Sequence, residues 1–458
     1  MWPTSQTAGF PRRCLKRPGP DMLNPLRHTT FRFLFASQVL SLTGVGLMTA
    51  GLSLAAWQIG GASHAGPILG LIFALKMIAY VGFSPLAQAA LARLPRVRAL
   101  IGLDAARLLF MVPLAFVSSW WTIAVLAFLF FAVSSAFTPL FQALIPSVLP
   151  DKETYSEALS LSRIAYTLES ILTPILVGAA LMFMHTEYLF VLAAMGFAGS
   201  ALCLLLSRRG GHDVHAQNQD PFLTRAVRGL WIYAGTPRLR GLFVMNFGLS
   251  LVMAWILVNT IVYAGTRFEN AEQVFPWLMG GYGVGAALAA VALPSLLRAF
   301  PERRVMAAGT FTFAILSPLI LLQPSLPGLV VLWASFGAAC TLTLTPGGLV
   351  LTRSASDADR PAVFAAQFSL SHAGWLVAYP LAGWLGAVFA PATALVMLAI
   401  LATLVTIAGL AVWPAKDPDL REHSHPNLPR DHPHIVSSHR GVHAHPFYID
   451  ELHPRWDA

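Results

Sequence analysis

Charged residues are scarce in this sequence of 458 residues: Asp, Glu, Lys and Arg make up 11% of it, and hydrophobic residues 56%. A soluble domain of average composition carries about 25% charged residues. A chain with so little charge cannot cover its folded surface with polar groups, so we expect lipid to surround most of it. The composition therefore excludes an ordinary soluble protein.

Cysteine is also scarce. Cys14, Cys203 and Cys340 lie far apart, and the last two lie within apolar runs. The sequence contains no CxxC pair and no spacing that indicates a disulfide framework. We therefore expect Cys203 and Cys340 to be small buried residues without a redox role.

Motifs for nucleotide hydrolysis and for enzymatic catalysis are absent. There is no Gly-x-x-x-x-Gly-Lys-Ser/Thr loop, which argues against direct use of ATP. No Ser/His/Asp or zinc-hydrolase arrangement is found, so we expect neither an enzyme nor a bound cofactor. The formal net charge of +9 arises from the loops that flank apolar runs, and it does not indicate nucleic acid binding.

The N-terminal segment does not resemble a cleaved signal peptide. Residues 1–21 are rich in Pro and Arg and contain no apolar run, and Met22 is an alternative start to Met1. The first apolar run begins at Phe31 and is long enough to cross a membrane. We expect residues 1–30 to form a cytoplasmic leader.

Long apolar runs recur along the rest of the chain, and each is close to the roughly 20 residues that cross a bilayer as a helix. They predict an all-α polytopic membrane protein of about twelve transmembrane helices in two six-helix halves. The predicted spans are 33–57, 66–91, 99–118, 122–145, 158–183, 188–206, 241–264, 274–297, 304–323, 328–351, 363–388 and 391–413.

The basic residues predict the orientation of these spans. If the N-terminus is cytoplasmic, the outer loops carry only Arg267, and Lys76, Arg107 and Arg163 fall within spans. The remaining Lys and Arg residues then lie on the cytoplasmic side, as the positive-inside rule requires. We therefore expect a multi-pass protein of the bacterial inner membrane with both termini in the cytoplasm.

The longest internal connection, 207–240, divides the chain into two halves of six spans. Within it, Phe222, Val227, Leu230 and Trp231 fall near one helical face, which predicts an amphipathic helix on the membrane surface. The predicted domains are the leader at 1–30, a six-helix bundle at 31–206, the loop at 207–240, a second bundle at 241–414 and a His-rich tail at 415–458. Duplicated halves are typical of secondary transporters, whose substrate path lies between the halves.

Short motifs within residues 24–414 resemble the major facilitator superfamily. The turn from Ser84 to Arg98 is similar to that family's Gly-x-x-x-Asp-Arg-x-Gly-Arg-Arg loop, although Ala92 stands at its acidic position and Pro95 at its second Gly. The Asp104-Ala105-Ala106-Arg107 stretch is similar to the Asp-x-x-Arg that opens the third span of efflux members. Thr173-Pro174 keeps the Pro of the antiporter motif but lacks the preceding Gly residues.

A narrower resemblance rests on the block from Asp359 to Trp384 together with the His-rich tail. This combination resembles bacterial exporters linked to resistance against nickel and related metals. The resemblance implies a proton-coupled exporter of a divalent, nickel- or cobalt-like ion that works by alternating access. Its expected partners are the lipid bilayer, protons and a small ion or small molecule.

Two ionisable residues lie midway along predicted spans. Lys76 is in the second span and Glu169 in the fifth. An ionisable group in a span costs at least about 2.5–3.5 kcal/mol, so it usually has a partner or a function. The two residues are expected either to act as a proton or cation switch that opens when substrate binds, or to form a static buried ion pair. Asp104 and Arg107, near the cytoplasmic end of the third span, are candidates for coupling or for a charge network with the turn at 93–98.

Polar residues in other spans are candidates for the substrate pathway. His372 in the eleventh span combines with Glu169 as a possible pair of metal ligands, because imidazole and carboxylate suit divalent first-row metals. The alternative for a membrane histidine is a hydrogen bond between helices. The other pathway candidates, with the same alternative, are Gln38, Asn246, Asn259 and Gln367.

The tail contains repeated His-x-His pairs. In an extended chain, residues two apart point to the same side, so two imidazoles can converge on one ion. His-rich tracts are typical of metal binding, and the alternative is a solvated polar tail. The candidate metal ligands are His423, His425, His432, His434, His443 and His445.

Three functions remain open from the sequence. One is a metal-ion exporter loaded from the tail. The second is an exporter of amphipathic organic molecules such as drugs or siderophores. The third is a membrane sensor without transport activity, which would not need the buried charges at Lys76 and Glu169.

Overall fold

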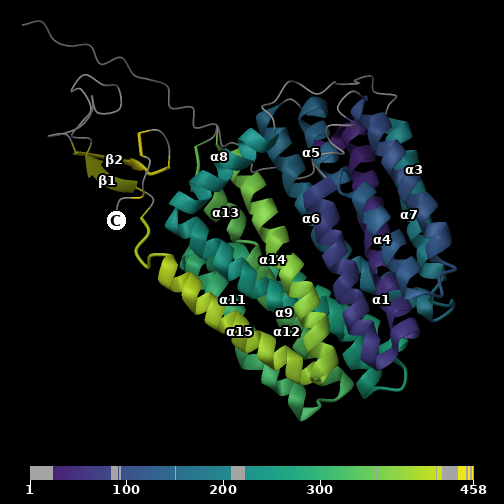
Figure 1. Cartoon of the computed structure of the whole chain (residues 1–458). Helices are drawn as coiled ribbons and strands as arrows, with labels where there is room; N and C mark the ends of the chain where they lie inside the picture. Colours follow the sequence, from purple (N-terminus) through teal and green to yellow (C-terminus); the bar gives the residue numbers. More distant parts are fainter. Residues whose placement is uncertain are drawn as a thin grey trace, which may run out of the picture.

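The computed structural model describes residues 24–83, 91, 94–149, 151–207, 222–356, 359–418, 420–424, 442–449, 452, 453 and 456. These residues form a bundle of long helices with a small β-hairpin beyond the end of the last helix (Figure 1). The predicted all-α class is confirmed for the bundle.

The first half of the bundle begins with a short 3₁₀ helix and is helical almost throughout. Its elements are η1 (Asn24–Arg27), α1 (Thr29–Ile78), η2 (Ala79–Phe83, a π-helix), α3 (Arg96–Leu114), α4 (Trp120–Ser134), α5 (Phe137–Val148), α6 (Lys152–Leu181) and α7 (Tyr188–Ser207).

The 50 residues of α1 contain a break in the helix at Gly61. The backbone of Gly61 has φ 55° and ψ −157°, and such a positive φ favours glycine because it has no Cβ. The first arm matches the predicted span 33–57, and the second arm with η2 covers the described part of the predicted span 66–91, up to Phe83. Residues from both arms line the same cavity, which a straight helix of this length would not allow.

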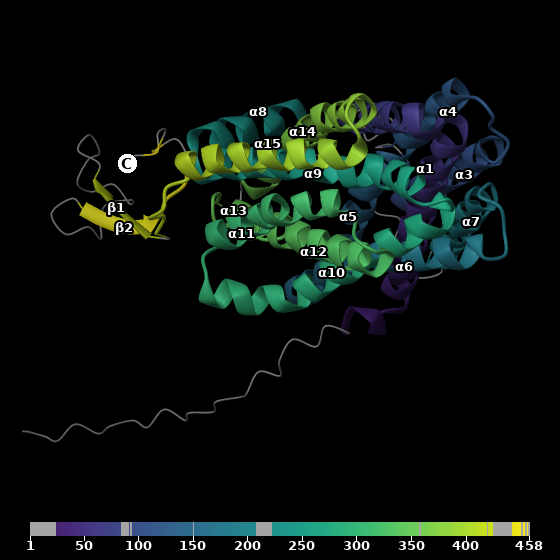
Figure 2. The ribbon, with the colours of Figure 1, turned by 90° about the horizontal axis from the view of Figure 1, so that it is seen from below.

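The amphipathic helix α8 (Phe222–Gly235) precedes the second half, which has a similar series of helices. They are α9 (Pro237–Arg267), α10 (Ala271–Ala299), α11 (Glu302–Leu316), η4 (Ser317–Leu322), α12 (Leu326–Leu344), α13 (Gly347–Thr352), α14 (Arg360–Val388) and α15 (Pro391–Val412). The antiparallel strands β1 (Leu420–Ser424) and β2 (Val442–Pro446) form the hairpin, which Figure 2 shows beyond the end of α15.

Eight helical segments in the described part of the chain are long and apolar enough to cross a membrane. The first covers 55 residues, Thr29–Phe83, and includes the predicted span 33–57 and most of the predicted span 66–91. Helices α3, α6 and α14 coincide with three further predicted spans, and α3 alone carries Arg96, Arg98, Asp104 and Arg107. The protein is therefore a multi-pass membrane protein.

The buried side chains show how the two halves meet. One large cluster contains residues of both halves, including Leu47 and Phe73 from α1 with Trp255 from α9 and Tyr379 from α14. Near the break at Gly61 in α1, Gln58 donates a hydrogen bond of 2.8 Å to Glu272 of α10. The halves thus share a core toward the end of the bundle near Gly61.

At the opposite end, where α1 and α9 begin, the described residues form two separate clusters. One contains Phe31, Leu34 and Leu204 of the first half, and the other contains Leu239 and Trp413 of the second half. The second cluster also includes residues of α8 and of the chain after β2. The two halves therefore have separate cores at the end of the bundle that carries the hairpin.

Candidate substrate cavity

A cavity of about 890 Å³ lies between the two halves. Its walls come from α1, η2 and α3 to α6 of the first half and from α9, α10 and α14 of the second. Many of its side chains are aromatic: Phe73, Tyr80, Phe137, Phe141, Phe275, Tyr282, Phe364, Phe368 and Tyr379. Its size is in the range of cavities that hold small organic molecules.

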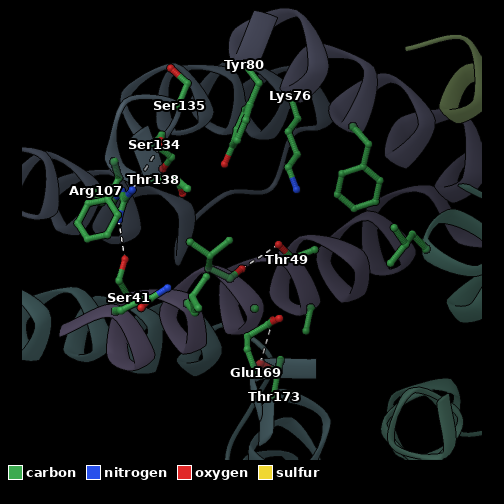
Figure 3. A pocket seen from close by; sticks show the side chains of 18 of the residues that line it. Ser41, Thr49, Lys76, Tyr80, Arg107, Ser134, Ser135, Thr138, Glu169 and Thr173 are labelled. Carbon is green, nitrogen blue, oxygen red and sulfur yellow. Dashed lines mark hydrogen bonds between the residues drawn. The ribbon is translucent and has the colours of Figure 1, made fainter. Parts of the chain in front are cut away.

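Two side chains of opposite charge face this cavity. Figure 3 shows Lys76 and Glu169 reaching toward the same space from opposite sides. The Lys76 Nζ lies 5.2 Å from the ring centre of Phe131 and 5.8 Å from that of Tyr80. The Glu169 Oε1 accepts a hydrogen bond of 3.3 Å from Thr173 Oγ1. In this conformation no ion pair at contact distance among the described residues joins Lys76 to Glu169, although the two charges attract each other across the cavity.

Glu169 lies directly against the backbone of α1. A Cβ atom added at Gly46 would overlap both Glu169 Oε1 and Thr173 Oγ1. The absence of a side chain at Gly46 therefore lets α6 bring its carboxylate to the cavity wall. Neither Gly46 nor the role of the Thr173 hydroxyl was predicted from the sequence.

Asp104 and Arg107 form a buried charge network inside the first half. Arg107 Nη1 lies 3.1 Å from Asp104 Oδ1 and donates a hydrogen bond of 2.8 Å to Ser41 Oγ of α1. Ser200 of α7 donates a hydrogen bond of 2.6 Å to Asp104 Oδ2. The Arg107 guanidinium also lies 4.1 Å from the ring centre of Phe137.

This network joins α3 to α1 and α7, and a 3.4 Å hydrogen bond from Arg107 to the Ser134 carbonyl extends it to α4. Arg107 also lines the cavity, whereas Asp104 is fully buried away from it. The arrangement fixes the packing of four helices around one charged pair. These contacts indicate that Asp104 and Arg107 stabilise the packing of the first half.

Of the four predicted pathway amides, only Gln38 lines the cavity, where it accepts a hydrogen bond of 2.9 Å from Ser162 of α6. Asn259 donates a hydrogen bond of 2.8 Å to the Ala382 carbonyl and thereby packs α9 against α14. Asn246 is buried elsewhere along α9, and Gln367 accepts a hydrogen bond from Tyr233 of α8. These three residues lie outside the lining of this cavity in the present conformation, because packing sets which helix face meets it.

His372 lies where the two halves meet, but its described contacts are aromatic. Its ring stacks on Tyr80 at 5.8 Å between centroids and lies 3.9 Å from Phe368. Its Nδ1 lies 2.7 Å from the Phe368 carbonyl oxygen, which can only accept, so this nitrogen carries the hydrogen. No group of three or more His, Cys, Asp or Glu side chains that could hold a metal occurs among the described residues.

The sequence matches the Major Facilitator Superfamily profile over residues 34–269 and 242–436. The chain belongs to the major facilitator superfamily. No curated protein matches it. Among solved structures, a POT family transporter in complex with 5-aminolevulinic acid is similar over 84% of this chain and 96% of its own, with 12% identity and a TM-score of 0.68.

Two further solved structures have the same fold. The nucleoside transporter NupG is 13% identical, with a TM-score of 0.64, over 84% of this chain and all of its own. A bacterial homolog of the human lysosomal transporter Spinster, in an inward-facing and unoccupied conformation, is 13% identical, with a TM-score of 0.65, over 87% of this chain and 97% of its own. This major facilitator protein is thus a secondary transporter by fold and family.

The tail of this major facilitator protein is only partly described. The strand register places His423 opposite His443 and Arg421 opposite His445. His425, His432 and His434 lie outside the described residues. The chain between α15 and the hairpin is anchored by Asp417, which lies 3.6 Å from Arg238 of α9 and 2.9 Å from Arg353.

After the hairpin, Phe447 and Ile449 join the buried cluster of the second half. Trp456 lies beside Phe447, and the Arg238 guanidinium is 4.8 Å from the Trp456 ring centre. The described parts of the tail pack on the end of the second half, because their aromatic and apolar residues meet buried side chains of α8 and α9.

Proposed function

We propose that this protein is a proton-coupled exporter of amphipathic organic molecules, working by alternating access of two six-helix bundles in the bacterial inner membrane. The observation that carries the proposal is the large aromatic cavity between the halves, which holds one carboxylate and one ammonium group. The resemblance of Asp104 and Arg107 to the efflux motif supports the direction of transport. With both termini in the cytoplasm, the separate cores at the hairpin end correspond to a conformation that is loaded from inside.

Glu169 is the proposed proton carrier. Among the described residues that line the cavity, it is the one acidic side chain. Thr173 and the close approach of α1 hold its carboxylate at the cavity wall. A change in its charge on proton uptake or release would therefore act directly on a substrate in the cavity. Ionisable side chains in this position are typical of proton relays in transporters.

A divalent metal ion is the second candidate cargo, and the observation that favours it is the register of the hairpin. His423 lies opposite His443, and neighbouring residues on paired strands have Cβ atoms about 4.5–5.5 Å apart. The register therefore brings two histidine positions next to each other on paired strands. A bare dication in the cavity, however, would meet the Lys76 ammonium beside a single carboxylate, so the cavity itself favours an organic substrate.

An accumulation assay separates the two cargoes. Cells of a bacterial strain without its own exporters would produce the full-length protein, and their content of nickel, cobalt, zinc and copper would be measured beside that of fluorescent amphipathic aromatics. The matched variant replaces His423, His443 and His445 by Ala and keeps His453, whose ring packs on Phe447 at 4.8 Å.

We expect lower accumulation of aromatic compounds, by at least about threefold, and the same reduction in the histidine variant. Metal content should not change with either protein. If the wild-type protein lowers the cell content of one metal and the histidine variant does not, the cargo is that metal ion and not an organic molecule.

A further inference from the structure

Lys76 is a cation with no carboxylate at ion-pair distance among the described residues, and Glu169 attracts it only from across the cavity. Its ammonium group is near the rings of Phe131 and Tyr80. Ring faces attract a cation, but they compensate only part of the solvation that an ammonium group loses within a membrane protein. A ligand that brings a negative charge to this position would supply a partner in direct contact.

The carboxylates of Glu169 and Asp104 each accept a hydrogen bond from another residue. Glu169 accepts from Thr173 on the opposite side of the cavity, and a side chain at Gly46 could not fit between them and α1. Asp104 is paired with Arg107 and accepts from Ser200. The positive charge of Arg107 is thereby balanced within the protein, whereas the charge of Lys76 is open to the cavity (Figure 3).

Aromatic side chains line the cavity that Lys76 faces. Phe73 lies on the same arm of α1, and its ring centre is 5.2 Å from that of Tyr379 across the two halves. Phe275 and Phe368 also line the cavity. Such rings favour an aromatic body by stacking or edge-to-face contact.

We infer that Lys76 and the surrounding aromatic wall form a binding site for an aromatic organic anion, with the anionic group of the substrate on the Lys76 ammonium. This inference rests on the proposed function, because it names the substrate class of the same cavity. In this arrangement Glu169, on the opposite side of the cavity, remains available to bind the proton. The expected substrates have a carboxylate attached to an aromatic ring system.

Calorimetry on the full-length protein in lipid nanodiscs tests this site with three probes of one shape: naphthoate, its neutral amide and naphthylmethylamine. We expect naphthoate to bind at least about tenfold more tightly than the amide and the amine. Lys76→Met should remove this preference while amide binding stays unchanged, which also shows that the variant is folded. Lys76→Arg should keep the preference, and Lys416→Met, a change of an exposed Lys outside the cavity, should have no effect.

Equal binding of naphthoate to the wild type and to Lys76→Met would overturn the inference, as would a preference for the amine or no binding of naphthoate to the wild type. Because binding is measured without a proton gradient, its outcome is independent of transport. Selective binding without proton-driven movement would refute the proposed function and leave the anion site standing.

Discussion

Replacing Glu169 by Gln should reduce net transport to background, a loss of at least about tenfold, while the amount of protein in the membrane stays normal. Gln has nearly the same size as Glu, and its side-chain oxygen can still accept the hydrogen bond from Thr173. It cannot take up or release a proton, so the step that couples the substrate to the proton gradient is lost. Net export from loaded membrane vesicles is the measurement.

The matched control is Glu269→Gln, which removes an exposed carboxylate outside the cavity and should leave transport unchanged. Exchange of labelled for unlabelled substrate requires no net proton movement, so Glu169→Gln should still perform it. If the Glu169 variant drives net export at the wild-type rate, this residue has no part in the coupling.

Arg107→Met should destabilise the protein by about 3–5 kcal/mol, because it leaves the buried carboxylate of Asp104 without its positive partner. It also removes the hydrogen bonds to Ser41 and to the Ser134 carbonyl, which join α3 to α1 and α4. We expect a lower midpoint of thermal unfolding in detergent and a lower yield of folded protein.

The double variant Asp104→Asn with Arg107→Met separates charge from packing. Because it contains no uncompensated buried charge, it should recover part of the stability that the single variant loses. A single variant that unfolds at the wild-type temperature would show that this network contributes little to folding, and it would reopen a role for Arg107 at the cavity wall.

The general architecture follows from the sequence because hydropathy and membrane thickness act over whole helices. Runs of about 20 apolar residues and the paucity of charge predicted the helices α7, α9, α10 and α15 within a few residues. The break at Gly61 falls in the gap between the predicted spans 33–57 and 66–91, and α8 lies in the loop where the sequence predicted an amphipathic helix.

The site was predicted only in part, because a sequence states which residues are polar but not which helix face meets the cavity. Lys76, Glu169 and Gln38 line it, whereas Asn259 forms a hydrogen bond between α9 and α14. The aromatic wall could not be distinguished from the many aromatic residues that face lipid or core. The close approach at Gly46 depends on how α1 crosses α6, which no local pattern encodes.

The tail illustrates the same limit. Its His-x-His pairs were visible, but the antiparallel register that sets His423 opposite His443 is a long-range contact. The anchoring of the tail by Asp417 on Arg238 and Arg353 likewise joins residues from distant parts of the chain. Composition predicted the polarity of this segment, but it did not predict the packing of Phe447 and Ile449 on the second half.

In the proposed mechanism, one cavity couples an organic substrate to a proton through Glu169. The most direct test loads proteoliposomes with a pH-sensitive dye and records proton flux and movement of labelled naphthoate together, for the wild type and for Glu169→Gln. We predict proton flux that starts with the addition of naphthoate in the wild type and is absent in the variant. Naphthoate movement without proton flux, or equal proton flux in both proteins, would contradict the account.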